Sequence, residues 1–201
     1  MTKIQNVGLY ILSKYGKEAG TIELNKLFYL VDVASYRLLG KTISRTKYVR
    51  AEMGPYSRAI SQELCLLEDK QVKRETKPSK GFSSFPKVAW SVTKGIKIKP
   101  ELELDEKEII NKVLEIVSGL SPRELEKLSY KTEPMLYILD KESKVNCPQF
   151  QVPLDFTKIK RDEFMREFIS NLKTPISEEE QKQIEYYDRE WKEVELMLQG
   201  N

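Results

Sequence analysis

Histidine is absent from this chain of 201 residues, and cysteine occurs only at Cys65 and Cys147. Without an imidazole, the Ser-His-Asp and Cys-His nucleophile systems and all histidine-based metal sites are excluded. Two cysteines that stand far apart in the sequence make neither a zinc site nor a disulfide framework, and they are typical of a reducing compartment. The sequence therefore predicts a cytoplasmic protein with no bound metal.

Long apolar runs and glycine-rich loops are also missing. No stretch approaches the ~20 apolar residues of a membrane span, and the N-terminal residues lack the features of a signal peptide. The nine glycines match neither a phosphate-binding loop nor a dinucleotide-binding fingerprint. Carboxylates are plentiful, but a run such as Glu178-Glu179-Glu180 is typical of a solvated first helical turn. We therefore expect no membrane contact, no cofactor and no enzymatic activity.

The composition is that of a soluble globular protein, with 32% charged and 40% hydrophobic residues. A net charge of +3 is too small to indicate nucleic-acid binding by itself, because acidic and basic residues are interleaved. The length suits one domain with an appendage. Because the chain becomes irregular and proline-containing after residue 145, we expect a domain at residues 1–145 and a C-terminal helical extension at 146–201 that packs on it.

Residues 24–64 carry the strongest pattern in the chain. A helix is expected from about Ile22 to Leu39, with Thr21 as its N-cap and Gly40 just past its end. Its core face consists of Leu24, Leu27, Phe28, Val31, Ala34 and Leu38. Beside it lies a second face, here called the polar ridge, formed by Lys26, Tyr29, Asp32 and Tyr36. The ridge is either a helix edge whose polar groups bond to neighbouring backbone, or a recognition groove.

A short strand and a turn follow this helix. Residues 48–52 alternate bulky and charged side chains, as in a strand, and Gly54-Pro55 then ends it, with Pro55 opening a helix that runs to about Asp69. Residues 72–75 and 88–92 read as a β-hairpin, which residues 48–52 could join as a third strand. The sequence thus predicts an α+β, predominantly helical fold with a small antiparallel sheet or hairpin inserted after the third helix.

Capping signals mark most of the remaining helices. The spacing of a capping box occurs at Thr2 and Gln5, at Asp105 and Glu108, and at Ser121 and Glu124. A further helical turn is expected at residues 135–139, and helices at 161–172 and 177–198. The last helix carries a narrow apolar seam of Ile184, Tyr187, Trp191, Val194 and Leu198. This seam is covered either by the 161–172 helix or by a partner or second copy of the chain.

The order of several short motifs resembles a known family. The motifs are Lys-Leu-Phe-Tyr-Leu-Val-Asp at residues 26–32, then Tyr36, Gly40, Tyr48 and the turn Gly54-Pro55-Tyr56, and a second signature at residues 125–134. Together they resemble the Panacea domain, the SocA-like antitoxin family of bacterial and phage toxin–antitoxin systems. Many relatives carry histidine at the positions of Met53 and Tyr130, and tryptophan at that of Met135, so no role that needs an imidazole carries over.

The resemblance implies a non-enzymatic antitoxin that neutralises a cognate toxin, encoded nearby, by direct protein–protein binding. The resemblance does not name the toxin, because the family pairs with toxins of unrelated chemistry. As candidate partner-binding residues we assign Lys26, Tyr29, Asp32, Tyr36, Tyr48, Tyr56 and Tyr130. Gly54 and Pro55 are assigned as a structural turn.

A winged, nucleic-acid-binding regulator is the main alternative. Helices followed by a β-hairpin suit such a domain, and this hairpin carries Lys73, Arg74, Lys77, Lys80 and Lys87. A second basic patch could be lined by Arg37, Arg45, Lys47, Arg50 and Arg58. Nucleic acid is not favoured as a partner, because no helix in the first half has the dense basic and amide face of a recognition helix. A phage or host adaptor protein and a homo-oligomer are further alternatives.

Overall fold

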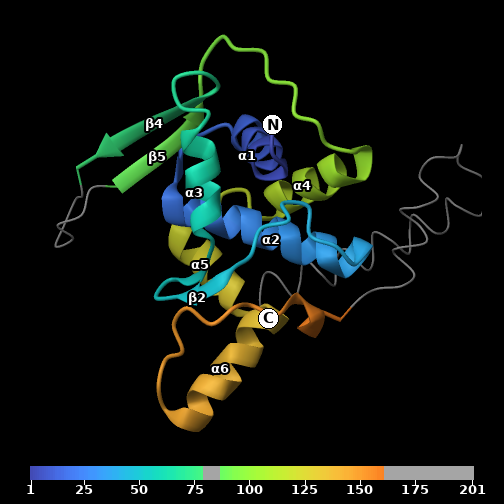
Figure 1. The fold of residues 1–201 in the computed structure, drawn as a ribbon, viewed down its shortest axis with the longest axis vertical. Coiled ribbons are helices and arrows are strands. Elements are labelled where there is room, and N and C mark those ends of the chain that lie inside the picture. The colour runs from blue at the N-terminus through green and yellow to red at the C-terminus, as the bar shows by residue number, and fades with distance from the viewer. Residues whose placement is uncertain (79–86, 161–201) are drawn as a thin grey trace, which may run out of the picture.

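The computed structural model describes residues 1–78 and 87–160. These residues form a helix-rich α+β fold, as the sequence predicts. Helix α2 (Thr21–Leu39) runs through the centre of the molecule (Figure 1), and α4 and α5 pack against it. The other helices are α1 (Lys3–Tyr15), α3 (Arg58–Cys65), α4 (Leu104–Ile116), α5 (Pro122–Tyr130) and α6 (Glu133–Val145).

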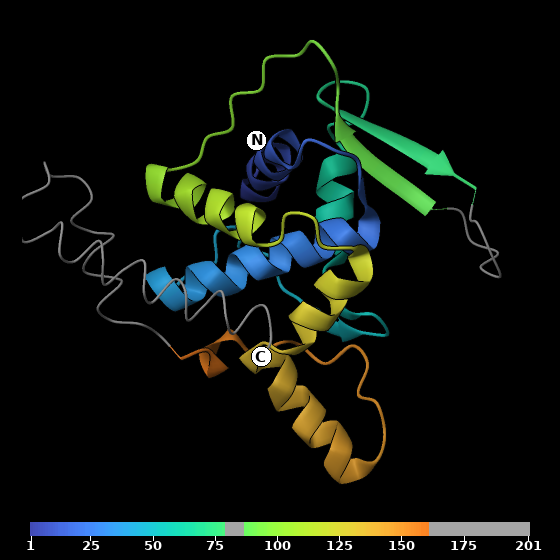
Figure 2. The same cartoon turned by 180° about the vertical axis from the view of Figure 1, so that it is seen from behind.

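Five short strands form two separate antiparallel sheets. They are β1 (Ala19–Gly20), β2 (Val49–Ala51), β3 (Gly54–Tyr56), β4 (Val72–Lys77) and β5 (Lys87–Val92). The expected hairpin is β4–β5, and it projects from the end of the helical body opposite to α6 in both Figure 1 and Figure 2. The expected third strand is wrong, because the two-residue β1 takes that place beside β5 while β2 pairs only with β3 in the named sheets.

Each end of α2 is marked by a glycine whose backbone N–H is hydrogen-bonded. At the C-terminal end, Gly40 adopts φ +69° and its N–H bonds to the Tyr36 carbonyl, as expected for a glycine that ends a helix. At the N-terminal end the cap is Gly20 instead of Thr21, and the Glu23 carboxylate accepts the Gly20 N–H at 3.1 Å. The Thr21 hydroxyl is engaged elsewhere, because it accepts a 3.0 Å hydrogen bond from Trp90 Nε1.

The Gly54-Pro55 segment differs from its sequence-based prediction. Instead of opening a helix, Gly54-Pro55-Tyr56 forms strand β3, in which Pro55 lies opposite Arg50. Proline is tolerated there because it stands at the edge of a sheet, where no N–H is required of it. Helix α3 begins only at Arg58. The residue before it, Ser57, donates its backbone N–H to Asn25 Oδ1 at 2.7 Å.

Two other helix boundaries are set by contacts that the sequence does not reveal. Helix α4 begins at Leu104, because Glu106 bonds back to the Glu103 N–H at 2.9 Å and also pairs with Lys3 at 2.6 Å. The expected turn at 135–139 is the first half of the longer helix α6. Its second half is largely polar and exposed, so apolar periodicity could not reveal it, and Asp140 pairs there with Lys144 at 2.6 Å.

Residues 149–159, here called the strap, lie along β2, near the end of the described part of the C-terminal extension. The strap runs antiparallel to β2, with Val49 opposite Pro153, and ends in a 3₁₀ turn, η1 (Phe156–Lys158). Leu154 and Ile159 from the strap are buried in the core. The helices expected at 161–172 and 177–198, the apolar seam and Lys80 lie outside the described residues. Among the helices of the described part, none is long and apolar enough to cross a membrane.

Candidate functional site

The polar ridge of α2 lies inside the molecule, at the junction of α2, the β2–β3 hairpin and α5. Lys26, Tyr29 and Asp32 expose at most 1% of their surface, and Tyr36 is partly buried. Of the two interpretations of the ridge, the structure agrees with the helix edge that bonds to its neighbours and not with an exposed recognition groove. The physical reason is that the polar end of each of the three buried side chains finds a hydrogen-bond partner within the fold, so burial leaves none of them unsatisfied.

Lys26 binds the turn between the two small strands. Its Nζ donates to the Pro55 carbonyl at 2.9 Å. Burial lowers the pKa of the Lys26 ammonium to about 8, against the opposing effect of the Glu126 carboxylate. Lys26 thus holds the β2–β3 hairpin against α2. This agrees with the interpretation of the ridge as a helix edge that bonds to neighbouring backbone.

Asp32 organises the connection between α2 and β2. Its carboxylate accepts the Ser44 N–H at 2.9 Å, the Tyr48 hydroxyl at 2.7 Å and the Ser44 hydroxyl. Burial raises the pKa of Asp32 to about 6, and these hydrogen bonds partly oppose the shift. Asp32 and Tyr48 therefore form one interior network that fixes the start of β2.

Three tyrosines converge on one aromatic ring of the strap. Tyr29 and Tyr48 meet edge to face with ring centroids 5.2 Å apart. The ring of Phe156 lies 5.8 Å from the centroids of Tyr29, Tyr36 and Tyr48. Tyr29 also exchanges a 2.6 Å hydrogen bond with the Thr132 hydroxyl, which ties α2 to the start of α6. We call Tyr29, Tyr36 and Tyr48 the tyrosine socket.

Gly54 is the point of closest approach between the β2–β3 turn and α5. It adopts φ +84°, and a Cβ atom there would lie 2.9 Å from Tyr130 Cε2 and 3.3 Å from Lys26 Nζ. Tyr130 in turn donates its hydroxyl proton to the Glu52 carbonyl at 3.1 Å. Glycine is thus required both for the backbone conformation and for the space under the Tyr130 ring.

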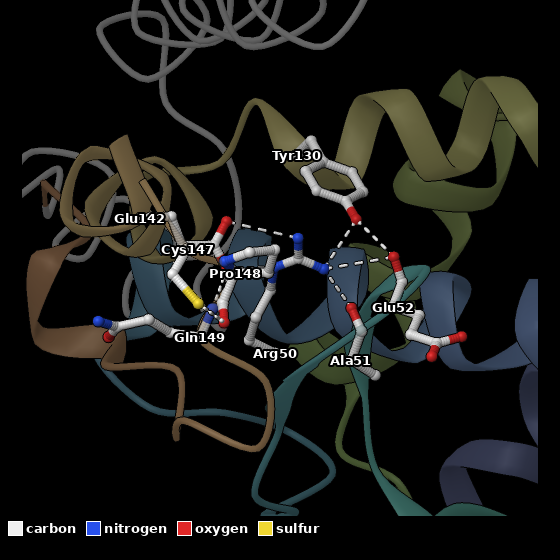
Figure 3. Close-up of polar contacts among 8 residues, drawn as sticks. All are labelled: Arg50, Ala51, Glu52, Tyr130, Glu142, Cys147, Pro148 and Gln149. Atoms are coloured by element: carbon white, nitrogen blue, oxygen red, sulfur yellow. Dashed lines mark hydrogen bonds and ion pairs between the residues drawn. The ribbon is translucent and has the colours of Figure 1, made fainter. Parts of the chain in front are cut away.

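Arg50 is the site residue whose role the sequence did not reveal. Figure 3 shows its guanidinium between Glu142 and Tyr130: Nε lies 3.1 Å from the Glu142 carboxylate, and the other end donates to the Tyr130 hydroxyl at 3.0 Å and to the carbonyls of Ala51 and Glu52. Arg50 is buried, although the sequence placed it in a surface patch. Its partner Glu142 lies 92 positions away, so no local pattern signals the pair.

The part of this region that a partner can reach is formed by aromatic and apolar edges around Arg50. Tyr56 and Tyr130 are partly exposed, and Met53 and Phe150 are each 45% exposed. The rings of Tyr130 and Phe150 lie 5.2 and 5.3 Å from the Arg50 guanidinium carbon. We call Met53, Tyr130 and Phe150 the exposed edge of the site.

The basic residues of the hairpin are largely matched by acids. Lys73 pairs with Glu75, Arg74 with Glu68 at 3.9 Å, and Lys77 with Glu18. In the second patch that the sequence indicated, Arg37 pairs with Glu133, whereas Arg45, Lys47 and Arg58 are exposed. A cleft of about 1030 Å³ between α1 and the hairpin is rimmed by Lys14, Lys17, Lys73 and Lys94.

No cluster of three or more metal-ligating side chains occurs among residues 1–78 and 87–160.

Comparison with known proteins yields one finding. A family model described as an antitoxin SocA-like, Panacea domain matches residues 24–134, which is more than half of the chain. No curated protein and no solved structure matches the chain. The matched residues contain the polar ridge, both strands of the β2–β3 hairpin and Tyr130.

Proposed function

The chain belongs to the SocA-like antitoxin family with a Panacea domain, and on this premise we propose that it neutralises a cognate toxin by binding it directly, without catalysis. The observation that carries the proposal is the arrangement of the polar ridge. Lys26, Tyr29 and Asp32 are buried and committed to structural hydrogen bonds. They position a surface instead of presenting reactive groups.

The surface that they support suits a protein partner. The exposed edge combines an apolar side chain, Met53, with two aromatic rings, Tyr130 and Phe150, around the buried charge of Arg50. Aromatic residues and methionine are enriched in the cores of protein–protein interfaces, where a few such side chains carry most of the binding free energy. We therefore expect the toxin to contact this edge.

The test is co-expression with the protein encoded by the neighbouring open reading frame. Growth should be rescued, and the two proteins should co-purify as a stable complex. Tyr130→Ala and Met53→Asp should weaken the complex, whereas Leu104→Asp, a substitution at an exposed residue of α4, should leave it unchanged. Rescue with no detectable complex would contradict direct neutralisation.

Salt dependence separates this function from nucleic-acid binding. A DNA complex releases counterions and weakens steeply as salt rises, whereas a largely apolar protein interface does not. Lys73, Arg74 and Lys77 of the β4–β5 hairpin are paired with carboxylates, which supports the protein partner over DNA. Binding of the operon's promoter DNA, with a steep loss between 50 and 200 mM salt, would instead favour the winged-domain alternative.

A further inference from the structure

The strap covers β2 in the way that an added strand would. The N–H of Arg50 donates to the Val152 carbonyl at 2.9 Å, and the N–H of Gln151 donates to the Arg50 carbonyl at 2.7 Å. One step further along, the N–H of Leu154 donates to the Tyr48 carbonyl at 2.9 Å. Without the strap, these backbone groups of β2 would be the open edge of a two-stranded sheet, which is a template for pairing with another chain.

One ring anchors the strap beside this edge. Phe156 is partly buried and contacts all three rings of the tyrosine socket. The socket itself is formed by residues of the family-matched region, while the whole strap lies beyond residue 134, where the match ends. A segment outside the matched region thus fills a site that is built by residues inside it.

We propose that the β2 edge and the tyrosine socket form a docking groove for an extended segment of the toxin, which displaces residues 151–159 of the strap and leaves Phe150 in the exposed edge. The occupant is a strand that pairs with Tyr48 and Arg50 through its backbone and inserts an aromatic side chain at the position of Phe156. Strand addition of this kind takes affinity from main-chain hydrogen bonds and specificity from side-chain pockets. The proposal rests on the proposed function, and it names the groove and the chemical form of the partner.

Two features of the strap favour its exchange. Gln151 adopts φ +65°, a left-handed conformation that is unfavourable for a residue other than glycine, asparagine or aspartate. Val49 and Pro153 form a non-hydrogen-bonded pair, so the three backbone hydrogen bonds described above are what holds the strap to β2. A tethered strap competes at a high effective concentration, so the apparent affinity for a partner strand equals the intrinsic affinity multiplied by the fraction of time that the groove is open.

A covalent lock tests whether the strap must leave. Val49 and Pro153 face each other across the antiparallel bridge, so Val49→Cys with Pro153→Cys can be joined by a disulfide in a Cys65→Ser, Cys147→Ser background. The oxidised lock should lose toxin binding at least tenfold, and reduction should restore it. The two single-cysteine variants under the same oxidant are the controls. An oxidised lock that binds toxin as well as its reduced form overturns the proposal.

A peptide tests the groove without the toxin. A fluorescent peptide with the sequence of residues 149–160 should bind the Phe156→Ala chain at least tenfold more tightly than the wild-type chain, and should not bind the oxidised lock. Leu104→Ala is the control, because that side chain is exposed on α4 and lies outside both the socket and the strap. If Phe156→Ala fails to melt cooperatively, or melts cooperatively but binds no peptide, the groove is not exchangeable and the proposal is wrong.

The two experiments separate the groove from the proposed function. If the wild-type chain neither binds nor neutralises the neighbouring protein, the antitoxin function fails, and the peptide still decides whether the groove accepts a strand. If neutralisation occurs but the lock has no effect on it, the toxin binds elsewhere and only the groove proposal fails.

Discussion

Single residues decide how closely the β2–β3 turn approaches α5. We predict that Gly54→Ala lowers the free energy of unfolding by about 2–4 kcal/mol, because a Cβ at φ +84° is strained and would press on the Tyr130 ring. Gly119→Ala is the matched control: it has a similar φ of +82° but open space around it, and should cost only about 1–2 kcal/mol. Chemical denaturation of both variants checks this. Equal losses would show that Tyr130 moves aside freely.

Asp32 should give the protein a recognisable dependence on pH. Its pKa is raised to about 6 in the folded state, so between about pH 4 and pH 6 the folded chain holds a proton that the unfolded chain has released. The free energy of unfolding should therefore fall as pH rises through this window, by at most about 3 kcal/mol. Asp32→Asn should remove this slope from the stability–pH curve.

The control for this pH dependence is Asp140→Asn, because that carboxylate is exposed and pairs with Lys144 on the same helix. It should leave the slope as it is in the wild type. Identical slopes for Asp32→Asn and the wild type would show that the buried carboxyl group does not titrate in this range.

At the residue scale, the sequence showed which side chains share the ridge but not where their polar atoms go. Periodicity along one helix places Lys26, Tyr29 and Asp32 on one face, because that depends only on residues three and four apart. Their partners are Pro55, Thr132 and Ser44, which approach only when the chain has folded. Without those partners in view, a buried polar network and an exposed recognition ridge have the same pattern.

At the scale of elements, one ion pair joins β2 to α6. The side chains of Arg50 and Glu142 are only 8% and 11% exposed, so removal of either leaves a nearly buried charge without its partner. We predict that Arg50→Met lowers the free energy of unfolding by about 3–5 kcal/mol. Arg50→Met with Glu142→Leu should recover part of this loss, since the double substitution buries no lone charge.

A double-mutant cycle measured by thermal or chemical unfolding gives the coupling energy of this pair. The exposed pair Lys144–Asp140 on the same helix is the control, and its coupling should stay within about 0.5 kcal/mol. A coupling between Arg50 and Glu142 as small as that would mean that this ion pair contributes little to holding α6 against β2.

The elements that sequence reasoning placed well are those with local signals. The capping boxes at Thr2 and Ser121, the glycine that ends α2, and the β4–β5 hairpin are all specified within a few residues. Strand β1 and the strap were missed for the opposite reason. The two residues of β1 are too few for any period to be detected, and the strap is extended only because it pairs with β2.

At the scale of the whole molecule, the hydrophobic core extends beyond the matched family region on both sides. The core is closed by Val7, Leu9 and Ile11 of α1 on one side of the matched sequence, and by Ile138, Leu154 and Ile159 on the other, all of them buried. We predict that a fragment of residues 24–134 shows no cooperative thermal transition by circular dichroism, while the full chain does. A fragment that melts cooperatively would show that α1 and the strap are dispensable.

The tyrosine socket and the Phe156 ring lie far apart in the sequence, so they are synthesised at different times. Tyr48 leaves the ribosome more than a hundred residues before Phe156, an interval of roughly 5–20 s at ordinary rates of synthesis. During that interval the nascent chain carries the β2 edge without the strap that will cover it. On the groove proposal, a toxin that meets the chain within this interval has no strap to compete with for the β2 edge.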